Sequence, residues 1–230
     1  VFTVKQDETG DFSSISQALD QIGVSISYVP GDTILVYPGT YFNNLLIEKA
    51  IVLKSLGGPE VTILDGNNSG TVVSLNRHAT ANYNGQPDIH ADIVLDGFKI
   101  QNGFSSGSES ASGGVIIGVS NSWVKNCIIQ NNNSYQGGGM YLEGGLVTET
   151  QIINNTASFG GGGIVFADRG INGFSSGNLM NCLVANNQSE YGSGTFGPMS
   201  IAHTTIANNS GGNGMQSAGG SSIYNSIVYG

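Results

Sequence analysis

Short apolar segments recur along the chain, and most of them end in a turn that is rich in Asn and Gly. Within each segment, apolar and polar residues alternate with a period of two, which is typical of β-strands and not of helices. Six of the segments share one pattern and align without gaps. They are 95–102, 124–131, 147–154, 179–186, 201–208 and 222–229. The chain therefore carries an internal repeat, with steps of 21 to 32 residues between copies.

When the six segments are aligned, residues of similar type occupy the same position in each segment. The aliphatic column contains Ile100, Ile129, Ile152, Val184, Ile206 and Ile227. Two places earlier stand Phe98, Cys127, Thr150, Cys182, Thr204 and Asn225, and two places later stand Asn102, Asn131, Asn154, Asn186 and Asn208. After each Asn turn a Gly precedes a larger residue, at 114–115, 139–140, 163–164, 194–195 and 214–215. Each repeat is therefore expected to hold at least two short strands.

One unit of this size cannot bury its own apolar face, whereas stacked units bury a continuous core. The pattern predicts an all-β fold, a coiled parallel β-solenoid with turns of about 21–25 residues that stack about 4.8 Å apart. A β-propeller needs about 40–50 residues per blade, and a left-handed β-helix needs hexapeptide repeats, which we do not find. Asn suits the shared turn position because it tolerates the left-handed backbone conformation. Its stacked side chains can also form a hydrogen-bonded asparagine ladder.

The N-terminal part fits the same scheme. Residues 12–22 place apolar side chains on one helical face, with Ser13 or Ser14 as the N-cap. A short amphipathic helix here would cover the open apolar end of the solenoid. Strand-like runs follow at 33–41, 45–48, 51–54 and 61–66. The prediction is a single domain over residues 1–230, with a capping helix at 12–22 and roughly eight or nine turns from residue 33 onward.

Two N-terminal segments resemble a known superfamily. Residues 6–19 read QDETGDFSSISQAL, and residues 31–41 read GDTILVYPGTY. Both are similar to the start of right-handed parallel β-helix proteins, the pectin-lyase-like superfamily, which includes pectin methylesterases and pectate or alginate lyases. The Asn-Asn, Gly-Gly-Gly and Asn-Ser-Ile-Val pattern further along the chain resembles the generic repeat of right-handed β-helix proteins, so the resemblance covers nearly the whole chain. It implies a right-handed parallel β-helix and raises the expectation of action on a polysaccharide, although fold does not fix function.

Composition and charge narrow the function classes. The chain has 230 residues, 36 of them Gly, with 10% charged residues and a net charge of −9. Nucleic acid is excluded as the expected partner because a phosphate backbone needs a basic stripe. No apolar run is long enough for a transmembrane helix. The sequence begins at Val1 without a signal peptide, so we expect a processed chain or excised domain from a secreted, extracellular or cell-surface protein.

A polysaccharide lyase is one hypothesis for the chemistry. Such enzymes need a base and a cation, either Ca²⁺ or a basic side chain, to neutralise the uronate carboxylate. No cofactor is implied with certainty, and Ca²⁺ is the candidate metal. Basic residues are few, and the candidates are Lys99, Lys125 and Arg169, with solvated surface charge as the alternative. An esterase would use Asp168 as nucleophile, although the segment around it, residues 163–169, is only loosely similar to the active-site segment of pectin methylesterases. A glycoside hydrolase would pair Asp96 with Glu149.

Substrate-binding candidates come from two groups. The insertion 76–92 is rich in titratable groups, with Arg77, His78 and His90 as candidates and loop decoration as the alternative. Aromatic side chains near the long insertions are suited to stacking on sugars or to packing under their own loops. They are Phe104, Tyr135, Phe159, Phe174 and Tyr191.

Cys127 and Cys182 share an inward column two turns apart, which exceeds disulfide reach. We expect two free, buried thiols.

Five Asn-X-Ser/Thr sequons occur, at Asn67, Asn132, Asn154, Asn187 and Asn208. Turns rich in Asn, Ser and Thr produce such sequons by chance, so we do not take them as evidence of glycosylation.

Two functions are predicted from the sequence. The first is interaction with a polysaccharide or cell-surface glycan, as a lyase or other carbohydrate-active enzyme. The second is a non-catalytic structural role, as an adhesin, surface-layer protein or filament unit. The sequence stops at Gly230 inside a repeat, so we expect either further residues, another domain over that end, or end-to-end self-association.

Overall fold

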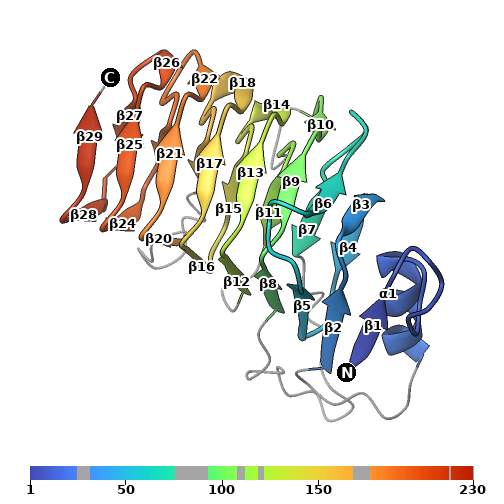
Figure 1. Ribbon diagram of the computed structural model, residues 1–230. Coiled ribbons are helices and arrows are strands. Elements are labelled where there is room, and N and C mark those ends of the chain that lie inside the picture. The colour runs from blue at the N-terminus through green and yellow to red at the C-terminus, as the bar shows by residue number, and fades with distance from the viewer. Residues whose placement is uncertain are drawn as a thin grey trace, which may run out of the picture.

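The structure is a computed structural model that describes residues 1–24, 32–75, 93–107, 112–118, 122–167, 177–217 and 219–229. Over these ranges it contains one helix and 29 short strands. The strands form four sheets, and the ladders between neighbouring strands are parallel. Figure 1 shows the strands stacked side by side along a rod, with the N-terminus at one end and the C-terminus at the other.

The two longest sheets have nine and eight strands. Sheet A contains, in spatial order, β1 (Phe2–Val4), β2 (Asp32–Val36), β5 (Ile51–Ser55), β8 (Ile93–Asp96), β12 (Ser122–Lys125), β16 (Leu146–Thr148), β20 (Asn178–Met180), β24 (Ser200–Ala202) and β28 (Ser222–Tyr224). Sheet B contains β3 (Gly39–Phe42), β6 (Thr62–Asp65), β9 (Lys99–Gln101), β13 (Ile128–Gln130), β17 (Gln151–Ile153), β21 (Leu183–Ala185), β25 (Thr205–Ala207) and β29 (Ile227–Tyr229).

The other two sheets complete each turn. Sheet C contains β4 (Leu45–Ile47), β7 (Val73–Leu75), β11 (Val115–Ile117), β15 (Met140–Leu142), β19 (Ile164–Phe166), β23 (Thr195–Gly197) and β27 (Met215–Ser217). Sheet D contains β10 (Phe104–Ser105), β14 (Asn133–Gln136), β18 (Thr156–Gly160), β22 (Gln188–Ser189) and β26 (Ser210–Gly211).

The chain visits the sheets in a fixed order. A turn such as β12, β13, β14 and β15 passes through sheets A, B, D and C before the next strand returns to sheet A. Each strand therefore pairs with the equivalent strand of the turn before and the turn after. This is the topology of a parallel β-helix, and crossovers between parallel strands of one sheet are right-handed in nearly all proteins.

The predicted register is confirmed over five of the six aligned segments. Ile100, Ile129, Ile152, Val184 and Ile206 are consecutive partners in sheet B. The last assignment is wrong by one residue, because Ile206 pairs with Val228 and not with Ile227. The shift places Asn225 at the turn position of His203, and both residues adopt a left-handed backbone conformation, with φ of 44° and 50°.

The interior is filled by one continuous core of inward-pointing side chains. Its largest fully buried members include Phe98, Phe166, Ile34, Leu53 and Leu95. Alternating burial along strands such as β2 and β5 shows the period of two that the sequence carries. Because each turn contributes a few apolar residues to the same core, stacking buries what a single turn could not.

An asparagine ladder runs through the turn between sheets B and D, but it lies one residue later than predicted. The predicted residues, Asn102, Asn131, Asn154, Asn186 and Asn208, adopt the left-handed conformation with φ between 54° and 56°. The residues that follow the last four of them point inward and form the ladder. Each amide nitrogen donates to the next amide oxygen at 3.0 Å along Asn132, Asn155, Asn187 and Asn209.

The N-terminal helix α1 (Ile15–Val24) packs against the first turn. Ile15 and Ala18 are fully buried in the core, and the backbone N–H of Gln17 donates to Ser14 Oγ at 3.2 Å, which makes Ser14 the N-cap. The helix begins later than residue 12 because Phe12 forms a bridge with Val4, and its N–H donates to the carbonyl of Thr3.

Cys127 and Cys182 are free and buried, with Thr150 between them in the stacked column. Burial raises the pKa of the Cys127 thiol to about 12 and that of Cys182 to about 11. We expect neither thiol to react with Ellman's reagent in the folded protein at about pH 8, because the thiolate is the reactive form. Both should react after unfolding.

The same shifts predict a pH dependence. The thiols of the unfolded chain have the ordinary pKa of about 9.0, so they ionise at a lower pH than the folded ones do. Ionisation then favours the unfolded state, so the free energy of unfolding should fall as pH rises above about 9. Rapid reaction of one thiol per chain under native conditions would contradict the buried placement.

Candidate functional site

The two predicted catalytic lysines that the structure describes lie on different sheets. Lys99 lies in β9 of sheet B, and its Nζ is 3.0 Å from a carboxylate oxygen of Glu60. Lys125 ends β12 of sheet A, and its Nζ is 3.7 Å from Asp96 Oδ2. Each ammonium group is thus directed at a carboxylate of this chain.

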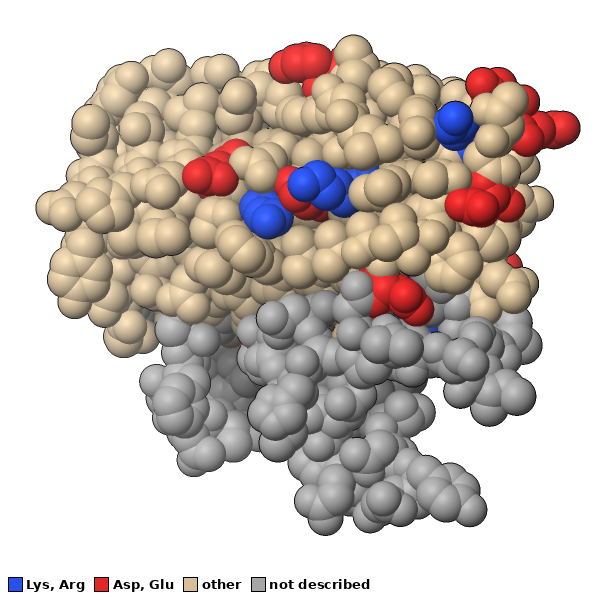
Figure 2. All heavy atoms as spheres, turned by 60° about the horizontal axis from the view of Figure 1, so that its bottom comes forward, with Lys and Arg blue, Asp and Glu red and all other residues tan. Residues whose placement is uncertain are grey.

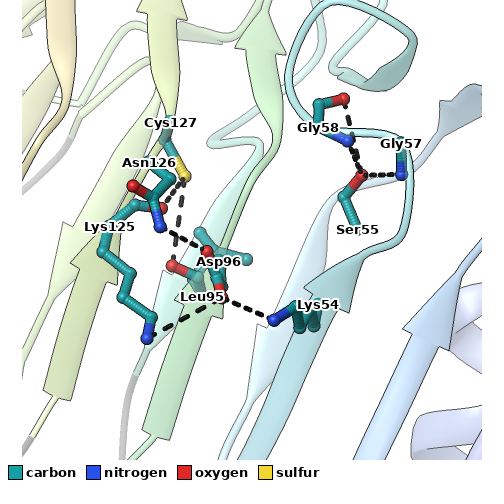
Figure 3. A network of polar contacts seen from close by, with 9 residues as sticks. All are labelled: Lys54, Ser55, Gly57, Gly58, Leu95, Asp96, Lys125, Asn126 and Cys127. Atoms are coloured by element: carbon teal, nitrogen blue, oxygen red, sulfur yellow. Dashed lines mark hydrogen bonds and ion pairs between the residues drawn. The ribbon is translucent and has the colours of Figure 1, made fainter.

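Asp96 is the centre of a polar network on sheet A (Figure 3). Its carboxylate is largely buried, and Lys54 from β5 and Lys125 from β12 approach the same oxygen, at 3.5 and 3.7 Å. The side-chain amide of Asn126 donates to the other oxygen at 2.8 Å. The network joins three consecutive turns, because Lys54, Asp96 and Lys125 are register partners.

The ammonium group of Lys125 also lies over the ring of Trp123, 4.2 Å from its centroid. The indole N–H of Trp123 donates to Thr148 Oγ1 at 2.8 Å. In Figure 2, blue and red side chains meet near the middle of one face, so charges of opposite sign lie together there. The structure does not favour Asp96 and Glu149 as a pair of catalytic carboxylates, because the Asp96 carboxylate already forms ion pairs with Lys54 and Lys125.

Several predicted site residues lie outside the described ranges. They are Arg77, His78, His90, Asp168, Arg169 and Phe174. Among the residues that the structure describes, no group of three His, Cys, Asp or Glu side chains is placed to hold a metal ion. Over the same ranges, no helix has the length and apolar character needed to cross a membrane.

Three of the predicted aromatic residues form a row of ring contacts along successive turns, the first contact stacked and the second tilted by 51°. The rings of Tyr135 and Phe159 are parallel with centroids 5.4 Å apart, and Tyr191 follows at 5.1 Å from Phe159. The faces that Tyr135 and Phe159 turn toward each other are therefore not available to a sugar. Tyr191 ends the stack and is 40% exposed. Phe104 is also exposed and lies earlier along sheet D, where its register partner is Asn133.

A depression of about 310 Å³ lies beside this aromatic stack. Its floor is formed by side chains of four consecutive strands of sheet C, namely Tyr141, Val165, Phe196 and Gln216, which are register partners. Tyr141 and Val165 are buried, with 9% and 4% of their surface exposed, whereas Phe196 and Gln216 are half-buried. Phe196 connects the two features, since its ring packs edge-on against Phe159 at 6.3 Å. We call this surface the sheet C depression.

Residues at both ends of these strands border the depression. Gln136 lies on the side of sheet D. Ala167 and Pro198, which follow the carboxyl ends of β19 and β23, and Ser217, which ends β27, lie on the other side. The described residues that line the depression are uncharged. The sequence held a usable signal, because each floor residue follows the Gly-plus-large pair of its repeat.

Comparison with known proteins identifies the fold of this chain but not its family. No protein-family model matches the chain, and no curated protein matches it. Among solved structures, a pectin methylesterase from Aspergillus niger in penultimately deglycosylated form superposes with a TM-score of 0.52. The two chains are 16% identical, and the match covers all of this chain and 85% of that one. This chain is a right-handed parallel β-helix.

A pectin methylesterase from carrot is 12% identical, with a TM-score of 0.48, over all of this chain and 83% of that one. At such identities the likeness concerns the course of the backbone. The side chains that act in this right-handed parallel β-helix must therefore be found from its own surface.

Proposed function

We propose that this β-helix is a polysaccharide-binding protein and that the sheet C depression is its binding surface. The observation that carries the proposal is the alignment of Tyr141, Val165, Phe196 and Gln216 on four stacked strands. Tyr141 and Val165 form the buried base of the depression, the half-buried Phe196 and Gln216 offer the larger contact surface, and polar groups stand at its edges. Ligand sites commonly combine apolar and aromatic walls with a few polar groups that fix orientation.

The chemistry of a sugar chain suits this floor. The C–H faces of pyranose rings pack on apolar and aromatic surface, while their hydroxyl groups need donors and acceptors. The side-chain amides of Gln136 and Gln216 supply both. The structural neighbours are pectin methylesterases, which supports a polysaccharide as the ligand. A target of this kind also favours a location outside the cell.

We propose binding and not β-elimination as the activity of the described residues. The lyase hypothesis needs a basic side chain that faces the substrate. Lys99 is directed at Glu60 and Lys125 at Asp96. Neither residue lines the sheet C depression.

Replacement of Phe196 by Ala should weaken binding of a recognised polysaccharide by about tenfold or more, because the variant loses the aromatic part of the floor. Affinity electrophoresis through gels that contain single polysaccharides identifies the ligand, and titration calorimetry measures the constant. Phe42→Ala is the matched control, since Phe42 is 66% exposed on sheet B, away from the depression. Equal affinity of the Phe196→Ala variant and the unmodified protein would refute the site, and retention by none of the polysaccharides would refute the function.

A further inference from the structure

We infer that the sheet C depression selects a neutral glycan, whose sugars carry no carboxylate, and holds it lengthwise along the helix axis. The inference rests on the proposed function and adds two properties, the charge class of the ligand and its direction. Both follow from the side chains that line the surface and from their register.

The charge class follows from what the depression offers. An anionic sugar that leaves water needs a cation or several strong donors. The described lining residues include neutral amides and a hydroxyl, at Gln136, Gln216 and Ser217, and no Lys or Arg. Lys54, Lys99 and Lys125 lie on sheets A and B and face carboxylates of this chain.

The charge of the whole chain acts in the same direction. With 7 basic and 16 acidic residues, the net charge is −9. A field of this sign disfavours the approach of a polyanion and leaves a neutral chain unaffected. A neutral glycan therefore meets no electrostatic cost from the described lining residues or from the net charge of the chain.

The direction follows from the register. Tyr141, Val165, Phe196 and Gln216 belong to successive turns, so they are stacked about 4.8 Å apart and together span about 14 Å along the axis. The bordering residues stand at the two ends of the strands, Gln136 on one side and Pro198 and Ser217 on the other. A glycan that contacts all four floor residues must therefore run from turn to turn, parallel to the axis. One strand spacing is comparable to the length of one pyranose unit.

The test compares neutral and acidic oligosaccharides of matched length on the full 230-residue chain. The neutral probes are β-1,4-linked glucose, xylose and mannose oligomers and α-1,4-linked glucose oligomers, and the acidic probes are galacturonate and mannuronate oligomers. Titration calorimetry at low and high salt should show binding of a neutral series only, with an affinity that changes less than about twofold with salt. The affinity should rise by about tenfold or more from one sugar to three and then level off.

Two variants make the result specific. Gln216→Lys places a cation on the floor and should introduce measurable, salt-sensitive affinity for an acidic oligomer, whereas Gln101→Lys on sheet B should not. Binding of acidic oligomers to the unmodified chain that depends on Phe196 would overturn the charge class while the proposed function stands. An affinity that is already maximal for a monosaccharide would overturn the lengthwise direction. Absence of binding by every probe would count against the proposed function itself.

Discussion

Replacement of Asn155 by Ala is expected to lower the free energy of unfolding by about 3 kcal/mol and the melting temperature by roughly 10 °C. Asn155 is fully buried in the middle of the asparagine ladder. Its side-chain oxygen accepts from the backbone N–H and the amide of Asn132, and its amide donates to Asn187 and to the carbonyl of Ile129. The variant therefore leaves several buried polar groups without their partner, and water cannot replace it in a closed core.

The adjacent Asn154 provides the matched control. It is exposed and has a φ of 56°, so its role in the fold is to supply the left-handed backbone and not a buried amide. Asn154→Gly keeps that conformation available and should change the free energy of unfolding by less than about 1 kcal/mol. Thermal unfolding followed by circular dichroism compares the two variants. Similar melting temperatures for both would show that the ladder contributes little to stability.

Replacement of Gly194 by Ala should be equally damaging, at about 3 kcal/mol, for a steric reason. A Cβ at this position would stand 2.5 Å from the carbonyl oxygen of Gly214 on the next turn and 2.8 Å from the amide nitrogen of Asn209. A backbone oxygen held between stacked strands cannot move aside without separating the turns. The glycine is therefore required by the close approach of neighbouring turns.

Gly214 is the control for this second prediction, because it occupies the same column one turn later. A Cβ added there meets no atom within 4 Å. Gly214→Ala should therefore leave the melting temperature within a few degrees of the unmodified protein. If Gly194→Ala melted at the same temperature as Gly214→Ala, the stacking distance in this part of the helix would have to be larger than described.

The fold can be predicted from the sequence because the residues that recur in each repeat are ones that the backbone requires at those positions. Asn marks the left-handed turn and Gly marks the close approach of neighbouring turns. The ladder was misplaced by one residue because the turns carry two consecutive Asn, as at Asn154 and Asn155. The period-2 rule fails at a turn, so the sequence does not say which of the two points inward.

The candidate site was less predictable for a related reason. Interactions such as Lys125 with Asp96 join residues on different turns, and their existence depends on the three-dimensional register. A short list of basic residues could therefore suggest catalysis, although Lys99 and Lys125 face carboxylates of the same chain. The depression was missed because Phe196 and Gln216 are unremarkable in sequence and become neighbours only when their strands stack.

The stacking of equivalent strands has a consequence for how such a protein changes over generations. Each turn adds one outward side chain to the floor of the sheet C depression, as Val165 and Phe196 do. Duplication of the segment that encodes one turn would lengthen the floor by about 4.8 Å and leave the remaining contacts in place. The preferred length of the bound chain would then be set by the number of repeats in the gene, without redesign of any individual contact.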